Sequence, residues 1–295
     1  MKKKQKSGIL ILFIVFVYSI NSFACFYQDL KIQKADIQTF QKEIMAKICG
    51  EKEIVPGIKI PDRSKLENRK IALKYFDKVF KNIGYEPIRH VYSEEGENVY
   101  VILKASVETD EYVIFGAHYD SPGNAGANDN ASGTTIVLTA AKQLKEEENR
   151  SKNIIFVLFD QEERGLVGSR NFAKMIKEKN MNIHSVHTVD QMGWDNDADR
   201  AFELEIPYEG AVELYKKAVS SLKKDIQIHI TQVRGSDHSA FRSLDYKAVG
   251  ITEEYKNGDT TPYMHRPTDT YETINFDYME STTGVIIRVL QILIK

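Results

Sequence analysis

Segments of strand length alternate with segments of helical length from Asn130 onward, and this alternation constrains the fold more than any other feature. The near-continuous apolar run "IIFVLF" at 154–159 is typical of a strand buried on both faces. The pattern predicts an α/β fold, a single domain with a central mixed, mostly parallel sheet flanked by helices on both faces. The expected strands are 86–92, 98–104, 112–117, 154–159, 187–189, 202–206, 226–231 and 248–253, and the expected helices are 29–48, 64–84, 133–145, 167–179, 209–223, 238–244 and 278–294.

The first 24 residues differ in composition from the rest of the chain. Four lysines among the first six residues precede an apolar run at 9–18, and Ser22-Phe23-Ala24 follows. This order is typical of a secretory signal peptide, and the run of about ten apolar residues is shorter than the roughly 20 that span a bilayer. We therefore expect an exported protein, secreted or periplasmic. A lipid anchor at Cys25, giving a membrane-anchored lipoprotein, is the alternative.

Residues 25–85 are expected to form a helical segment that packs on a catalytic domain at 86–295. Ser64 is the expected cap of the second helix, and Gly84 is its expected end. Cys25 and Cys49, the two cysteines of the chain, could pair or stay free. Two thiols cannot build a zinc-thiolate site, so any metal must lie on histidines and carboxylates. The net charge of -2 gives no basic field for nucleic acid.

Polar side chains gather where the expected strands end, which is where open α/β sheets bind ligands. Nitrogen and oxygen ligands without thiolate suit zinc, with manganese or cobalt as the alternatives. Their number exceeds the needs of one tetrahedral catalytic ion, whereas two metals bridged by a carboxylate use the set economically. These residues are His118, Asp120, Asp129, Asp160, Glu162, Glu163, Asp190, His265 and Asp269.

The glycine-rich loop "GAHYDSPGNAGANDNASG" at 116–133 has two other readings. A phosphate-binding loop would end in Gly-Lys-Ser/Thr, but Gly133 is followed by two threonines, so this reading is rejected. Asp129, Asn130 or Ser132 could instead cap the helix that follows.

Six motifs in series carry a resemblance to a known family. "GAHYDS", "GANDNASG", "DQEERGLVGS", "VDQMGWD", "GSDHSAF" and "HRPTDT" occur in this order between residues 113 and 275. The chain resembles the co-catalytic two-zinc aminopeptidases of metallopeptidase family twenty-eight, such as the bacterial leucyl aminopeptidases. Glutamate carboxypeptidase and the glutaminyl cyclases are relatives of this family. The resemblance implies a zinc-exopeptidase fold of the phosphorylase/hydrolase-like type.

The resemblance also implies a role for each metal ligand. His118 and Asp190 would bind one zinc ion, and Glu163 and His265 would bind the other. Asp129 would bridge the two ions. The expected cofactor is therefore two Zn²⁺ per chain.

Further residues take catalytic roles by the same resemblance. Glu162 would activate a zinc-bridged water as general base and then serve as general acid. Asp120 would orient His118 through the second ring nitrogen. The peptide bond between Asp129 and Asn130 is expected to be cis.

Two positions depart from the family pattern. Met264 stands where the family often has tyrosine, so the group that stabilises the oxyanion is not fixed, and Tyr263 and Arg234 are the candidates. Gln191 stands where methionine is frequent.

The expected function is that of a zinc-dependent exopeptidase, an aminopeptidase acting on peptides. A glutaminyl-peptide cyclase, which uses one zinc, and a carboxypeptidase, which needs a basic group for the terminal carboxylate, are alternatives on the same fold. An inactive binding protein is a third alternative, but such relatives typically lose ligands and this chain keeps them.

Overall fold

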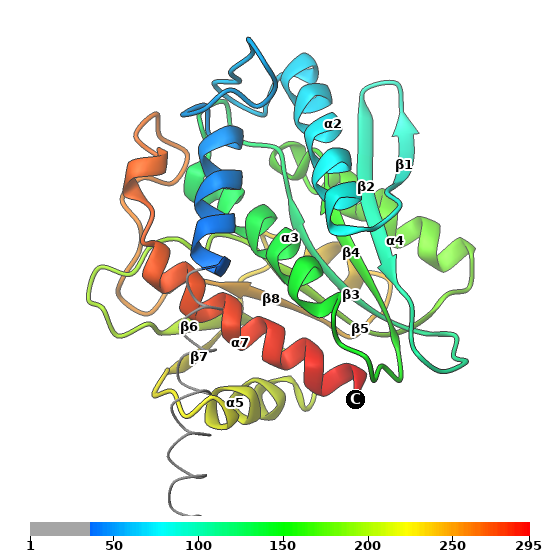
Figure 1. The fold of residues 1–295 in the computed structure, drawn as a ribbon. Helices are drawn as coiled ribbons and strands as arrows, with labels where there is room; N and C mark the ends of the chain where they lie inside the picture. Colours follow the sequence, from blue (N-terminus) through cyan, green and yellow to red (C-terminus); the bar gives the residue numbers. More distant parts are fainter. Residues whose placement is uncertain (1–35) are drawn as a thin grey trace, which may run out of the picture.

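The central sheet of the molecule has eight strands in the order β1-β2-β4-β3-β5-β8-β6-β7. The structure, a computed structural model, describes residues 36–295 (Figure 1). The expected signal peptide and Cys25 lie outside these residues. The strands are β1 (Ile88–Ser93), β2 (Gly96–Leu103), β3 (Glu111–His118), β4 (Asn153–Phe159), β5 (Asn182–Val189), β6 (Phe202–Glu205), β7 (Ile228–Thr231) and β8 (Ala248–Thr252).

The strand pairings confirm the expected mixed sheet. The pairs β3–β4, β3–β5, β5–β8 and β6–β7 are parallel. The pairs β1–β2, β2–β4 and β6–β8 are antiparallel. The carboxyl ends of β3, β4 and β5 therefore meet at one edge of the sheet.

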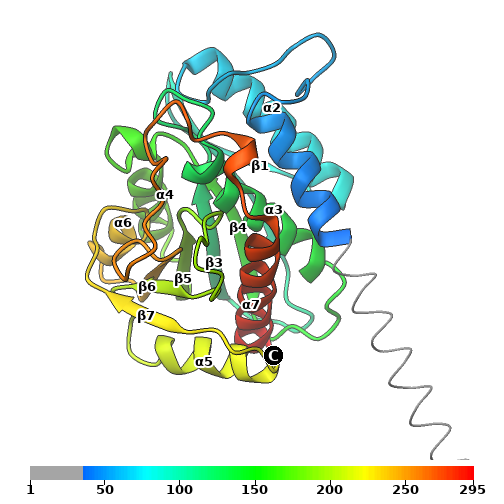
Figure 2. The same ribbon diagram turned by 90° about the vertical axis from the view of Figure 1, so that its left-hand side faces the viewer.

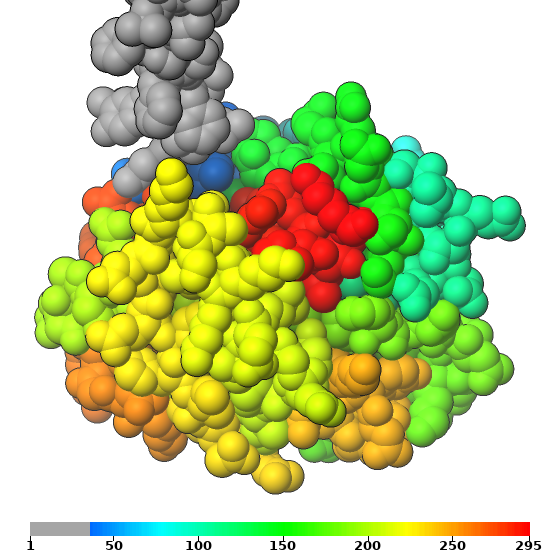
Figure 3. Space-filling model, turned by 90° about the horizontal axis from the view of Figure 1, so that it is seen from below, coloured from blue at the N-terminus to red at the C-terminus, as the bar shows by residue number. Residues whose placement is uncertain are grey.

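Helices cover both faces of the sheet, as expected. The helical residues 36–48 lie with α2, α3, α5 and α7 on one face, and α4 and α6 lie on the other (Figures 1 and 2). α7 also packs against α5, and Figure 3 shows its red C-terminal residues beside the yellow α5 segment. The helices are α2 (Leu66–Ile83), α3 (Gly133–Leu144), α4 (Val167–Glu178), α5 (Ala211–Ser221), α6 (His238–Arg242) and α7 (Phe276–Ile294).

β4 shows why its sequence reads as one apolar run. All seven of its residues are buried. Phe156 and Leu158 point into the core under α2, α3 and α7, whereas Val157 and Phe159 point into the core under α4. Alternate side chains of a strand project to opposite faces, so a strand covered on both sides needs apolar residues throughout.

The amino-terminal segment shares the main core with the sheet. Ile44 and Phe76 belong to the same buried cluster as Phe156. Cys49 is buried without a disulfide, and burial raises the pKa of its thiol to about 12. No helix within residues 36–295 is long and apolar enough to cross a membrane. The division at residue 85 stays a prediction.

Two local expectations were wrong. Ser64 does not cap α2: the capping position is Lys65, and the Asp62 carboxylate accepts the N–H groups of Ser64 and Lys65 instead. β5 begins at Asn182, five residues before the expected start at 187, because it already pairs there with Glu111 of β3. Gly84 ends α2 as expected, in the left-handed region at φ 92°.

Candidate metal centre

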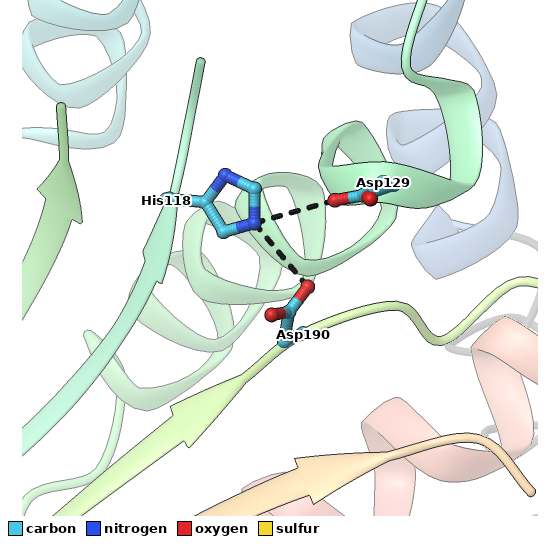
Figure 4. Close-up of side chains that lie close together, drawn as sticks. All are labelled: His118, Asp129 and Asp190. Atoms are coloured by element: carbon cyan, nitrogen blue, oxygen red, sulfur yellow. Dashed lines mark hydrogen bonds and ion pairs between the residues drawn. The ribbon is translucent and has the colours of Figure 1, made fainter. Parts of the chain in front are cut away.

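His118 is the last residue of β3 and lies buried at the edge of the sheet. Its Nε2 atom is 3.2 Å from Asp190 Oδ1 and 3.4 Å from Asp129 Oδ1 (Figure 4). Its Nδ1 atom is 3.4 Å from Asp120 Oδ1. Asp190 directly follows β5, which pairs with β3, so the strand order itself brings these side chains together.

Asp129 turns its second oxygen towards a different histidine. Its Oδ2 atom is 3.0 Å from His265 Nε2, which is also 3.5 Å from Glu163 Oε2. One carboxylate thus faces two sets of ligands, one through each oxygen. This is the geometry that a bridging carboxylate requires.

The backbone around Asp129 is fixed by side chains from other segments. The Asp269 carboxylate accepts hydrogen bonds from the N–H groups of Asn128 at 2.7 Å and Asp129 at 3.1 Å. The Asn130 amide donates to Val189 O at 2.9 Å and accepts from the Gln191 N–H at 3.2 Å. The bond between Asp129 and Asn130 is cis, as expected from the resemblance.

Glu162 and Glu163 lie in the short helix η2 (Glu162–Arg164) that follows β4. The Asp120 carboxylate accepts the N–H of Glu162 at 3.0 Å and that of Glu163 at 3.2 Å. Asp120 therefore ties the acid pair to the strand end that carries His118. The sequence predicted only the contact with His118.

The expected ligands fall into two overlapping sets. The ligand atoms of His118, Asp129 and Asp190 lie within 4.8 Å of one another, and so do those of Asp129, Glu163 and His265. The Oε1 atom of Glu163 is buried without a hydrogen-bond partner. Histidine nitrogens and unpartnered carboxylate oxygens in this arrangement fit zinc, whereas a purely structural polar network would satisfy these atoms.

The pKa values of the acid pair and of the two histidines are raised, which indicates that the site favours added positive charge. Burial raises the pKa of Glu162 to about 10 and that of Glu163 to about 8. Burial opposes the charged form of His118, but the neighbouring carboxylates outweigh it and raise its pKa well above 6.5. The hydrogen bond to Asp129 raises the pKa of His265 to about 9. Without a metal the cluster collects protons, which a bound cation would displace.

Arg63 supports the loop before Asp129 and was not singled out in the sequence. Its buried guanidinium donates to the carbonyls of Tyr119, Ala125 and Gly126 in this loop at 2.7–2.8 Å, and to Ile48 O at 2.7 Å. Gly126 has a φ of 55°, and a Cβ there would lie 2.4 Å from Asp129 O. No local pattern distinguishes such an arginine from a surface one.

Glu253, just after β8, is a second residue that the sequence did not reveal as part of the site. Its buried carboxylate accepts the Asn128 amide at 2.7 Å and the N–H groups of Gly193 at 3.0 Å and Trp194 at 2.7 Å. The signal that could have found it is a carboxylate directly after a mostly apolar strand.

A cavity of about 220 Å³ opens beside the ligands. Neither oxyanion candidate is among the residues that line it: Tyr263 packs edge-on against Trp194 at 5.3 Å between ring centroids, and Arg234 is exposed. A role for either in stabilising the oxyanion stays a prediction. Besides the acids of the cluster and His265, the lining includes Glu205, Val233, Ser236, Thr252, Tyr255 and Met264.

Comparison of the sequence with models of known protein families identifies one matching family. The sequence model of Peptidase family M28 matches residues 98–290. The chain is 28% identical to aminopeptidase YwaD of Bacillus subtilis (strain 168) over 252 residues, which are 81% of this chain and 51% of that protein. The chain spans about half the length of the curated relatives it matches.

Solved structures share the fold. The zinc aminopeptidase BSAP from Bacillus subtilis aligns with a TM-score of 0.63 and 25% identity, over 68% of this chain and 50% of that one. A glutaminyl cyclase from Porphyromonas gingivalis aligns with a TM-score of 0.69 and 14% identity, over 87% of this chain and 98% of that one. The second likeness shows the fold alone.

Proposed function

The chain belongs to peptidase family M28, and on that premise we propose that it is a zinc-dependent aminopeptidase acting on peptides. The observation that carries the proposal is the position of Asp129. Its two oxygens face two separate ligand sets, and Glu162 lines the same cavity.

Two zinc ions would be held by the ligand sets that share Asp129. His118 and Asp190 would complete one site, and Glu163 and His265 the other. Bound zinc would supply positive charge that polarises the carbonyl of the scissile bond and makes water a stronger acid.

Glu162 is the residue proposed to move the proton. Its carboxylate would accept a proton from the attacking water and pass it to the leaving amine. Because burial raises its pKa to about 10 in the metal-free protein, it serves as a base only when neighbouring cations lower that pKa. Asp120, which holds the Glu162 N–H, would keep the carboxylate in place.

The charge of the cavity favours the amino end of a peptide over the carboxyl end. No lysine or arginine lines the cavity in the described part of the chain, so neither would hold a terminal carboxylate. Several carboxylates line it and would attract a terminal ammonium. The cavity is smaller than the roughly 300–1,000 Å³ of typical ligand sites, which suits a single terminal residue.

A digest of end-blocked peptides tests this proposal. Zinc-loaded protein is incubated with one peptide in three forms, unblocked, N-acetylated and C-amidated, and the products are identified by mass spectrometry. We expect shortening from the amino end of the unblocked and amidated forms, and none of the acetylated form. Shortening of the acetylated form from its carboxyl end would contradict the proposal.

A glutaminyl cyclase is the alternative that needs a separate assay. A peptide with amino-terminal glutamine would lose ammonia without losing a residue, and mass spectrometry distinguishes the two products. We expect removal of the glutamine as a free residue, because a complete second ligand set is present around His265.

We propose in addition that the protein is exported, with cleavage after Ala24. The basic start and short apolar run of the first 24 residues support this proposal. Amino-terminal sequencing of the mature protein should read from Cys25, and mass analysis would reveal a lipid on that residue.

A further inference from the structure

Glu205 is a buried carboxylate that lines the cavity but has no part in the proposed chemistry. It is the last residue of β6, and its Oε2 atom has no hydrogen-bond partner. Buried carboxylates are normally paired or hydrogen-bonded, because leaving the charge unsatisfied is costly. The open side of this carboxylate is the cavity.

The side chain that contacts the Glu205 carboxylate in the described part of the chain carries no positive charge. His238 Nδ1 lies 3.4 Å from Oε2, but burial lowers the pKa of His238 to about 4, so the ring is neutral. No lysine or arginine forms an ion pair with Glu205 in residues 36–295. Burial, with a contribution from Asp190 and Glu203, raises its pKa to about 8. A cation entering the cavity would therefore stabilise its ionised form.

Gly250 makes room for this arrangement. It lies opposite Glu205 in the pairing of β6 with β8, and a Cβ on it would fall 2.3 Å from Glu205 Oε2. The same Cβ would fall 2.7 Å from His238 Nδ1. The carboxylate thus rests on bare backbone, where any larger residue would displace it.

The register places Glu205 on the same face of the sheet as the metal ligands. Gly250 pairs with both Glu205 and Thr188, and Thr188 lies two residues before Asp190. Residues in one row, and residues two apart, project to the same face. Because β8 separates β6 from β5, Glu205 lies two strand spacings, about 10 Å, to the side of Thr188, and Asp190 lies two residues further along the chain.

This distance decides which cation Glu205 can meet. The terminal amine of a substrate lies next to the scissile bond and hence beside the metal ligands. At that position it is too far from β6 to contact Glu205. The ammonium of lysine sits at the end of a four-carbon stem, and the guanidinium of arginine reaches similarly far. Val233 and Met264 offer apolar contacts for such a stem.

We propose that Glu205 is a specificity-determining residue that selects substrates whose first residue is lysine or arginine. This rests on the proposed aminopeptidase function. The aliphatic stem would lie along the cavity, and its charged end would meet the Glu205 carboxylate.

Lysine and norleucine substrates form the matched pair that tests this proposal, because they differ in the terminal charge. kcat/KM is measured for the fluorogenic amides of both amino acids with the zinc-loaded wild type, Glu205→Gln and Glu205→Leu. We expect the wild type to prefer the lysine amide, and Glu205→Gln to lower the lysine-to-norleucine ratio about tenfold or more, as for loss of a charge-assisted hydrogen bond. Glu205→Leu should lower this lysine-to-norleucine ratio further than Glu205→Gln does.

Glu203→Gln is the control. It is a buried carboxylate on the same strand, but it accepts the N–H groups of Lys256 at 2.7 Å and Asn257 at 2.9 Å and does not line the cavity. The lysine-to-norleucine ratio of kcat/KM for Glu203→Gln should equal that of the wild type. An unchanged ratio in Glu205→Gln, or an equal loss for both amides, would overturn the proposal.

Binding of free L-lysine and L-norleucine, measured by calorimetry on the same proteins, separates this inference from the proposed function. Weaker lysine binding in Glu205→Gln without any amide hydrolysis would sink the peptidase function and leave the charge recognition standing. Hydrolysis of both amides with no effect of the Glu205 substitutions would overturn the charge recognition and leave the peptidase function standing. Absence of both lysine preference and hydrolysis would overturn both.

Discussion

The ligand side of the cavity is held by a shell of carboxylates and amides, whereas the substrate side is lined by single side chains from separate segments. On the ligand side, Asp120 and Asp269 each fix two backbone N–H groups, and Asn130 bonds to the next strand end. On the substrate side, Glu205 and Met264 have no such shell. The chemistry of the site is thus built into the backbone, and its selectivity depends on individual side chains.

The largest effect should come from the ligand side, at Glu162. We expect Glu162→Gln to lower kcat about 100- to 10,000-fold, because a general base is lost, while the variant keeps its zinc. Kinetics with a leucine amide and elemental analysis of the metal give the two readouts. Ordinary turnover in a zinc-loaded variant would remove Glu162 from the mechanism.

Arg63 tests how far the ligand side depends on the amino-terminal segment. We expect Arg63→Met to destabilise the fold by about 3 kcal/mol or more, because four buried carbonyls lose a charged donor. Urea unfolding measures this, with Arg266→Met at an exposed arginine as the control. Equal stability of the two variants would mean that the loop is held by other contacts.

Asp269 tests the shell around Asp129 without removing a ligand. We expect Asp269→Ala to weaken zinc binding about 10- to 100-fold, because the N–H groups of Asn128 and Asp129 lose their acceptor. Competition with a chromophoric chelator measures the affinity. Asp259→Ala, at a carboxylate that holds the Trp194 loop, is the matched control and should bind zinc normally. Equal affinities in the two variants would contradict the role given to Asp269.

His187 probes the sheet away from the cavity and should give the smallest effect. Burial lowers its pKa to about 3, and its ring contacts the Tyr215 hydroxyl at 3.0 Å. Below about pH 6.5 the unfolded chain binds a proton that the folded chain does not, so stability falls as the pH decreases from there towards 3. This loss amounts to about 2 kcal/mol at pH 5.

His187→Gln should remove this part of the acid dependence. We expect the difference in unfolding free energy between the wild type and His187→Gln to shrink by about 2 kcal/mol between pH 7.5 and pH 5. Urea unfolding at both pH values measures it. A constant difference would show that His187 is not buried as a neutral ring.

The sequence predicted the architecture well because the residue pattern of strands such as β4, a continuous apolar run, reflects their burial on both faces. It also predicted which side chains meet at the sheet edge, because their positions after the expected strands and the motifs of the family resemblance both pointed to them. The start of β5 was missed because Asn182, His184 and Ser185 look like loop residues. Ser185 is buried and hydrogen-bonds to His187 at 3.1 Å, and His187 in turn contacts Tyr215 from α5 at 3.0 Å.

The supporting residues could not be predicted in the same way. Arg63 and Glu253 act through contacts with segments far along the chain, and nothing local marks Arg63. Glu205 faces the cavity only because Gly250 leaves space beside it. Such roles depend on tertiary packing, which a single sequence does not display.

The central claim is that Asp129 joins two metal sites, and the number of zinc ions bound per chain tests it most directly. Metal-free protein is dialysed against zinc and analysed for bound metal, with folding verified by circular dichroism. The account predicts two zinc ions per folded chain. A single zinc ion in a fully folded and saturated protein would contradict it.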